Sequence, residues 1–104
     1  MANKWGIPKD VELSVLARDE KCVYCGRAFG GNRASQRSWE HIVNDISLAT
    51  IDNIASCCVG CNASKGAKEL RVWLDSDNAR HRGISASTLA AVVVAALQGA
   101  AQTK

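Results

Sequence analysis

Residues 22–25 read Cys-Val-Tyr-Cys and residues 58–61 read Cys-Val-Gly-Cys, and these two stretches decide the fold. The two-residue gap within each pair lets both sulfurs reach one ion at about 2.3 Å, and two such pairs complete a tetrahedral shell. Four soft thiolates favour zinc over magnesium or calcium and leave no open coordination position. The spacing therefore predicts one structural zinc ion, held by Cys22, Cys25, Cys58 and Cys61.

The fifth cysteine, Cys57, falls outside this matched spacing, because Cys57-x3-Cys61 leaves a different gap. We expect Cys57 to be a buried thiol that points away from the metal. Five cysteines cannot all pair in disulfides, and clustered cysteines in a reducing compartment more often hold a metal. The competing interpretation, a set of buried or redox-active cysteines, does not explain the doubled spacing.

The composition is that of one small domain. The chain has 104 residues, of which 47% are hydrophobic and 5% aromatic, so the core is thin and a metal would add needed stability. The most apolar stretch, residues 89–97, is far shorter than the roughly 20 residues that cross a bilayer. The N-terminus has no apolar signal region. We therefore expect a cytoplasmic protein, in a bacterial cell or a phage-infected host, with no membrane partner.

Hydrophobic periodicity and turn residues predict an α+β fold. Pro8 suits the first turn of a helix, and Gly26 suits the sharp turn of a metal-binding knuckle. The expected elements, in chain order, are a helix over residues 8–19, a knuckle over 21–29, a loop over 30–38, strands over 39–43 and 54–57, and helices over 60–66 and 70–74.

A further amphipathic helix is expected near the C-terminus, capped by Ser85 or Ser87 and ended by Gly99. This helix should pack either on the chain's own helices or on the same face of a second copy, which would make a homodimer. The expected organisation is a domain over residues 1–82 followed by this helix within residues 83–104. The apolar face of the helix is formed by Leu89, Val92, Val93, Ala96 and Leu97.

Polar residues between and after the cysteine pairs carry a family resemblance. An acid-histidine dipeptide lies between the pairs, an asparagine follows it, and an asparagine and a lysine come directly after the second pair. This layout resembles the HNH endonucleases, and its spacing is similar to that of the zinc-bearing subgroup that includes phage endonuclease VII. The resemblance covers about residues 8–74. The residues that carry it are Glu40, His41, Asn53, Asn62 and Lys65.

The resemblance implies a small, treble-clef-like ββα-metal domain with flanking helices that hydrolyses DNA phosphodiester bonds. His41 would be the general base that takes a proton from water. Glu40 and Asn62 would hold one catalytic divalent cation, Mg²⁺ or Mn²⁺, because both offer hard oxygen ligands. Asn53 would brace the loop that carries the base, through hydrogen bonds to the backbone. The implied products carry 5′-phosphate and 3′-hydroxyl ends.

Two positions depart from the family pattern. Glu40 stands where the family commonly has Asp, so the carboxylate is one methylene longer and the position of the ion is less fixed. The Pro and paired Gly that often follow the histidine are also replaced, which offers Asn44 or Asp45 as an additional metal or phosphate contact. Taken alone, Glu40 and His41 would be the solvated end of a strand, but the surrounding cysteine pairs favour the catalytic interpretation.

Residues 21–39 contain four cations and no acidic residue, which favours a contact with nucleic acid. A solvated loop explains these charges about as well. A second basic cluster, Arg80-His81-Arg82, lies outside the resemblance, and we expect His81 to be a surface residue. The expected phosphate contacts are Arg27, Arg33, Arg37 and Lys65.

Two functions of different classes therefore compete. The first is a metal-dependent HNH endonuclease that cuts DNA. The second is a non-catalytic zinc module that only binds nucleic acid, using the same four cysteines and the basic loop. A binding module would not need Glu40, His41 and Asn62 together, so these three residues favour the enzyme. A redox thiol protein is a third interpretation, and the paired spacing of the cysteines disfavours it.

Overall fold

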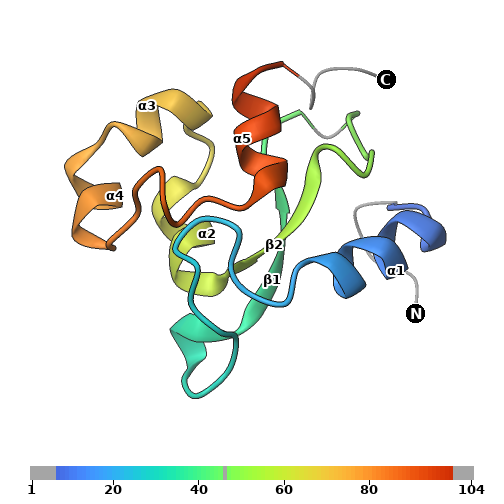
Figure 1. Ribbon diagram of the computed structural model, residues 1–104, viewed down its shortest axis with the longest axis horizontal. Helices are drawn as coiled ribbons and strands as arrows, with labels where there is room; N and C mark the ends of the chain where they lie inside the picture. Colours follow the sequence, from blue (N-terminus) through green and yellow to red (C-terminus); the bar gives the residue numbers. More distant parts are fainter. Residues whose placement is uncertain (1–6, 46, 100–104) are drawn as a thin grey trace.

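A two-stranded antiparallel sheet organises the computed structural model, which describes residues 7–45 and 47–99 (Figure 1). Five α-helices and one 3-10 turn complete the described part of the chain, and the expected α+β class is confirmed. The elements, in chain order, are α1 (Lys9–Arg18), η1 (Arg33–Ser35), β1 (Arg37–His41), β2 (Ile54–Cys58), α2 (Val59–Lys65), α3 (Leu70–Leu74), α4 (Asp77–His81) and α5 (Ala91–Leu97).

The register of the sheet decides which face each polar residue of β1 occupies. Arg37 lies opposite Cys58 at one end of the ladder, and His41 lies opposite Ile54 at the other. Because successive side chains of a strand point to opposite faces, Glu40 and His41 lie on different faces although they are neighbours in sequence. His41 ends β1 on the same face as Trp39, and its backbone carbonyl accepts a hydrogen bond from Lys65 of α2.

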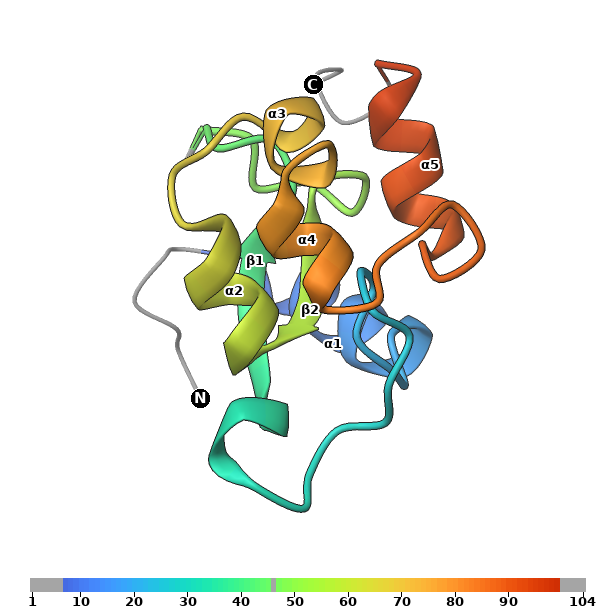
Figure 2. The same cartoon turned by 90° about the vertical axis from the view of Figure 1, so that its left-hand side faces the viewer.

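Each face of the sheet has its own apolar cluster. Val15 of α1 packs with Ile7 and Ile54 on one face, and Trp39 closes that cluster. On the other face, the helices that follow the sheet and the cysteine knuckle surround Tyr24 and Trp73, which are both fully buried. Figure 2 shows this arrangement, with α2 and α4 in front of the strands and α1 behind them.

Most of the expected elements are confirmed within two residues of their predicted ends. The helices α1, α2 and α3 match the predictions, and Gly26 has the positive φ of 74° that the knuckle turn requires. The first strand begins and ends two residues earlier than expected. It ends at His41 because the backbone of Val43 bonds to the side chain of Asn53 instead of a strand.

The C-terminal helix begins later than expected, at Ala91, so the predicted caps at Ser85 and Ser87 are wrong. These serines belong to a turn in which Ser87 N donates to Ser85 Oγ. The helix starts late because its N-cap, Ala90, has an extended backbone whose N–H donates to Val23 O at 2.9 Å. Its end at Gly99 is confirmed by a φ of 95°.

The apolar face of α5 packs on the chain's own core, where Val93 and Ala96 are buried. Leu89, Val92 and Leu97 pack against the same cluster and are partly buried. Intramolecular packing was one of the two predicted outcomes for this face. The homodimer was predicted through this same face, so a dimer would now need a different surface; the homodimer itself stays a prediction.

The short helix α4 was not predicted from the sequence. Its N-cap is Ser76, whose hydroxyl accepts a hydrogen bond from Ala79 N, and Asp77 occupies the first turn. A serine followed by an acidic residue is a recognised helix start, but no apolar period accompanies it over so short a helix. None of the helices in the described ranges is long and apolar enough to cross a membrane.

Candidate functional site

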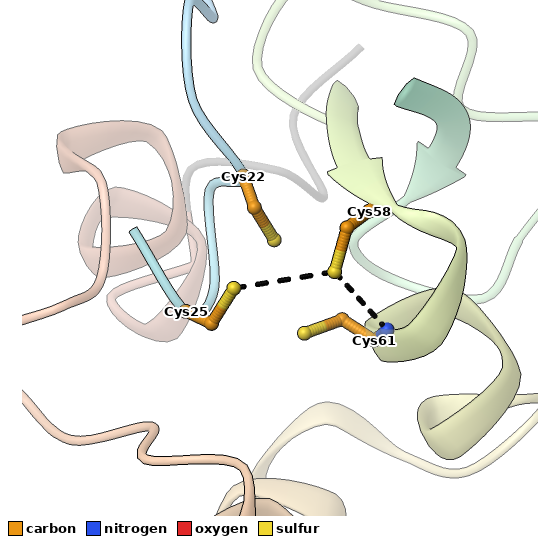
Figure 3. A group of neighbouring side chains, drawn as sticks. All are labelled: Cys22, Cys25, Cys58 and Cys61. Atoms are coloured by element: carbon orange, nitrogen blue, oxygen red, sulfur yellow. Dashed lines mark hydrogen bonds between the residues drawn. The ribbon is translucent and has the colours of Figure 1, made fainter. Parts of the chain in front are cut away.

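Four cysteines converge at the junction of the knuckle, β2 and α2 (Figure 3). All four residues are buried, and their sulfur atoms lie within 4.8 Å of one another. The Sγ atoms of Cys25 and Cys58, which come from different pairs, are 4.0 Å apart. Ligands at about 2.3 Å in a tetrahedron are about 3.8 Å from each other, so the cluster is close to the size that zinc requires.

Local backbone geometry builds each half of this cluster. In the knuckle, Gly26 N donates to Cys22 O and Cys22 N donates to Arg27 O, both at 3.0 Å. In the second half, Cys58 is the N-cap of α2, and its sulfur accepts a hydrogen bond from Cys61 N at 3.4 Å. This bond fixes the Cys58 sulfur at the start of α2, within reach of the other three sulfurs.

The protonation of the cysteines also suits a cation. A hydrogen bond with Cys61 lowers the pKa of the Cys22 thiol to about 4, and the same contact raises the pKa of Cys61. Burial raises the pKa of Cys25. A divalent ion would displace the protons of thiols such as Cys25 and Cys61 on binding. The four cysteines thus form a buried site that fits a structural metal such as zinc.

Cys57 lies outside this cluster, as predicted. It is fully buried on β2, opposite Ser38, and its sulfur lies 3.7 Å from Ser38 Oγ. Burial is the largest cause that raises the pKa of its thiol. A neutral, enclosed thiol of this kind is a core residue.

Glu40 is enclosed between the knuckle and α2, with a side chain that is 7% exposed. Its Oε2 accepts a hydrogen bond from the Tyr24 hydroxyl at 2.7 Å and lies 3.3 Å from Lys65 Nζ. Burial raises the pKa of Glu40, while Lys65 and Tyr24 act in the opposite direction. Both contacts use the same oxygen, and the described residues donate no hydrogen bond to Oε1.

Lys65 is the most enclosed cation of the site, with a side chain that is 1% exposed. Besides Glu40, its ammonium contacts His41 O at 3.4 Å. Lys65 was expected to contact phosphate, but its charge lies inside the protein, so such a contact would require the side chain to move. Long charged side chains are rarely buried unless they are paired, and here the pair is Glu40.

His41 is half-buried at the end of β1. Burial is the main cause that lowers its pKa, and the positive charge of Lys65 lowers it further. Asp45, in the loop after the strand, raises it. The imidazole is therefore predominantly neutral at neutral pH.

Asn62 and Asn53 connect the elements around His41. The side-chain nitrogen of Asn62, on α2, donates to Trp39 O at 2.9 Å and to Ser38 Oγ at 3.1 Å. Asn53 Oδ1 accepts from Val43 N at 2.7 Å, and its Nδ2 donates to two carbonyls of the loop, Val43 O and Leu48 O. The backbone hydrogen bonds expected of Asn53 are present.

The structure brings Glu40, Asn62 and Lys65 to the junction of β1 and α2, where His41 contributes its backbone carbonyl, and it leaves the arginines elsewhere. Arg33 is exposed in η1, near the start of β1, whereas His41 lies at its end. Arg37 donates to Asp19 O at 2.7 Å and stacks on Phe29, so it holds the fold together.

A catalytic cation would have few protein ligands at this junction. Two oxygens of the expected ligands, Glu40 Oε1 and Asn62 Oδ1, take part in no hydrogen bond with the described residues. The four cysteines are the one group of three or more His, Cys, Asp or Glu residues in the described ranges that could hold a metal. Mg²⁺ tolerates such a site, because it retains several waters and needs only one or two protein oxygens.

Comparison of the chain with known families, with curated proteins and with solved structures finds no match. The contacts described above therefore carry the functional interpretation.

Tyr24 is one residue that sequence reasoning missed. Its place between Cys22 and Cys25 was visible, but its bond to Glu40 depends on the fold.

Proposed function

We propose that the protein is a metal-dependent endonuclease that hydrolyses DNA phosphodiester bonds. The observation that carries this proposal is the bond from Asn62 to Trp39 O at 2.9 Å, which fixes α2 against β1. Because of this bond, the strand that carries Glu40 and His41 is packed on the helix that carries Asn62, beside a candidate metal centre. This junction also has the order of elements that the family resemblance implies, namely two strands followed by a helix.

His41 is the proposed general base. A base must be unprotonated at the working pH, and burial together with Lys65 lowers the pKa of His41 in the direction that this requires. In the proposed reaction, His41 accepts a proton from water while the water oxygen forms a bond to phosphorus. The bond between phosphorus and the 3′-oxygen breaks, and that oxygen takes a proton from solvent. The products are a 5′-phosphate and a 3′-hydroxyl.

Glu40 and Asn62 are the proposed ligands of a catalytic Mg²⁺ or Mn²⁺, through Glu40 Oε1 and Asn62 Oδ1. When bound, this cation would offset the charge that develops on the phosphate. The Tyr24 hydroxyl and Lys65 hold the other oxygen of Glu40, so the carboxylate is oriented before any cation binds. The positive charge of Lys65 also partly neutralises Glu40, which should weaken its hold on a divalent ion.

DNA is the proposed partner, and the exposed cations of the knuckle and the loop after it support this. Lys21, Arg27 and Arg33 are exposed. Arg27 and Arg33 were expected to contact phosphates, and both lie at the surface, although Arg27 also donates a long hydrogen bond of 3.5 Å to Arg82 O. Contacts of this kind position a duplex without reading its sequence. Arg37 is less suitable because its guanidinium already bonds to Asp19 O.

The test is cleavage of supercoiled plasmid by the zinc-loaded protein, with Mg²⁺, Mn²⁺ or EDTA. We expect nicking with either cation and none with EDTA, and His41→Ala should lose about 10²–10⁴-fold in rate. His81→Ala is the matched control, because His81 is exposed and is the other histidine of the chain. Ligation of the nicks by a ligase would identify the 5′-phosphate ends. A parent protein that binds DNA but cuts it with neither cation would overturn the proposal and favour a binding module.

A further inference from the structure

Arg82 contacts the cysteine cluster from outside. Its Nε lies 3.3 Å from Cys61 Sγ, and its Nη2 lies 3.7 Å from Cys58 Sγ. The residue is the C-cap of α4, so it comes from the part of the chain beyond the family resemblance. A guanidinium carries a positive charge, so its hydrogen bonds to these two sulfurs are charge-assisted and stronger than neutral ones.

Gly60 provides the space for this contact. It lies in α2, and its φ is not in the left-handed region, so the backbone does not require glycine. A Cβ at this position would overlap the guanidinium of Arg82. Glycine inside a helix is less favourable than alanine by about 1 kcal/mol. A side chain at this position would therefore displace the guanidinium from its present place.

The segment that begins at Arg82 also contacts the other cysteine pair. Thr88 Oγ1 donates to Tyr24 O at 2.7 Å, and Ala90 N donates to Val23 O at 2.9 Å. Both acceptors lie between Cys22 and Cys25. One stretch of chain, residues 82–90, is therefore bonded to both halves of the cluster, and we call this stretch the collar.

We propose that the collar controls how tightly the cysteine site retains its metal, with Arg82 as the main positioning residue. A zinc ion with four thiolates carries two net negative charges, and the guanidinium offsets one of them. Groups that donate to the ligands of a metal typically change its affinity by 10- to 100-fold when they are removed. The inference concerns the metal centre alone and holds whether or not the chain is a nuclease.

Zinc affinity of the full chain, measured by competition with a chromophoric chelator, is the first test. We expect Arg82→Met to weaken binding by about 10- to 100-fold, and Arg82→Lys to recover part of the loss. Arg80→Met is the matched control, because Arg80 is exposed and pairs with Asp75 and Asp77 instead of sulfur. Gly60→Ala should weaken zinc binding without changing the identity of residue 82. Thr88→Val should also weaken it, because Thr88 holds the backbone between Cys22 and Cys25.

Cobalt substitution separates a direct contact with sulfur from a general loss of stability. Loss of hydrogen bonds to the thiolates makes the sulfurs more electron-rich, so the sulfur-to-cobalt absorption band should move to longer wavelength in Arg82→Met. Arg80→Met should leave the band in place. Equal zinc affinity in Arg82→Met and Arg80→Met would overturn the proposal, and so would an unshifted cobalt band. If Arg82→Met fails to fold, Gly60→Ala and Arg82→Lys provide the same two measurements.

Discussion

The ammonium nitrogen of Lys65 lies 3.3 Å from Oε2 of Glu40, and both side chains are enclosed by protein. Each charge depends on the other, because an isolated ion in such surroundings loses its hydration without compensation. The pair joins α2 to β1 beside His41. Lys65 also places a permanent positive charge next to Glu40, the carboxylate that we propose as a ligand of a divalent cation.

Breaking this pair should be costly. We expect Lys65→Met to lower the free energy of unfolding by about 3–5 kcal/mol, because it leaves Glu40 as an unpaired buried charge. Urea denaturation of the zinc-loaded protein measures this loss. The double variant Lys65→Met/Glu40→Gln should recover most of it, since neither charge remains. A single variant as stable as the parent would show that the pair contributes nothing.

The same lysine should set the affinity for the proposed catalytic cation. In Lys65→Met the positive charge beside Glu40 is gone, so Glu40 should bind Mn²⁺ at least about tenfold more tightly at pH 8. Calorimetry measures this affinity. Lys68→Met is the control, because Lys68 is exposed and its ammonium donates to Ser64 O rather than to Glu40. Equal Mn²⁺ affinity in the two variants would remove the assignment of Glu40 as a ligand.

Stability should fall in mild acid because of His41. Burial and Lys65 lower the pKa of this residue in the folded protein, whereas the unfolded chain titrates near 6.5. The folded state therefore binds fewer protons, so the contribution of His41 is complete above about pH 6.5 and is lost as the pH falls towards the folded value. Both proteins of the comparison carry His81→Ala, and one also carries His41→Gln. The difference in their free energy of unfolding should shrink as the pH falls from 7 to 5. A constant difference would contradict a lowered pKa of His41.

Zinc content should distinguish the cysteines of the cluster from Cys57. We expect elemental analysis to find one zinc ion per chain, and Cys22→Ser to lose the ion and unfold, because binding energy is folding energy at such sites. Cys57→Ser should keep the full zinc content, since its sulfur is outside the cluster. Loss of zinc in both variants would place Cys57 among the ligands.

Asn53→Ala should loosen the loop that follows His41. The change removes three hydrogen bonds to the backbone of residues 43 and 48, at a cost of about 2–3 kcal/mol. Amide hydrogen exchange should quicken for Val43, whose N–H loses its acceptor. Asn53→Asp keeps an acceptor for this N–H but loses both donated bonds, so protection of Val43 should survive there.

Local patterns allowed much of the fold to be predicted. Each cysteine pair needs only a turn, so its spacing alone indicates the cluster, and the period of α5 indicates which side is buried. The sequence is less informative where a charge is involved. Arg37 and Lys65 read as solvated cations, yet one bonds to Asp19 O and the other to Glu40. Their partners lie 18 and 25 residues away in the chain, and no local pattern identifies them.

The start of α5 was misplaced for a related reason. Ser85 and Ser87 have the chemistry of caps, but they lie in a turn, and Ala90 is held by its bond to the knuckle. Arg82 is a similar case, because its partners are sulfur atoms of residues 58 and 61. Contacts between distant segments outweighed local preference at each of these positions.

Tyr24 connects three parts of the molecule. It stands between two cysteines of the cluster, its hydroxyl bonds to Glu40, and its ring meets that of Trp73 edge-on with centroids 4.9 Å apart. A lineage that replaces this tyrosine must compensate at more than one place. Among descendants of this sequence, substitutions at positions 24, 40 and 65 should accordingly accumulate together. The two residues between Cys22 and Cys25 should vary less than the residues of an ordinary two-residue turn.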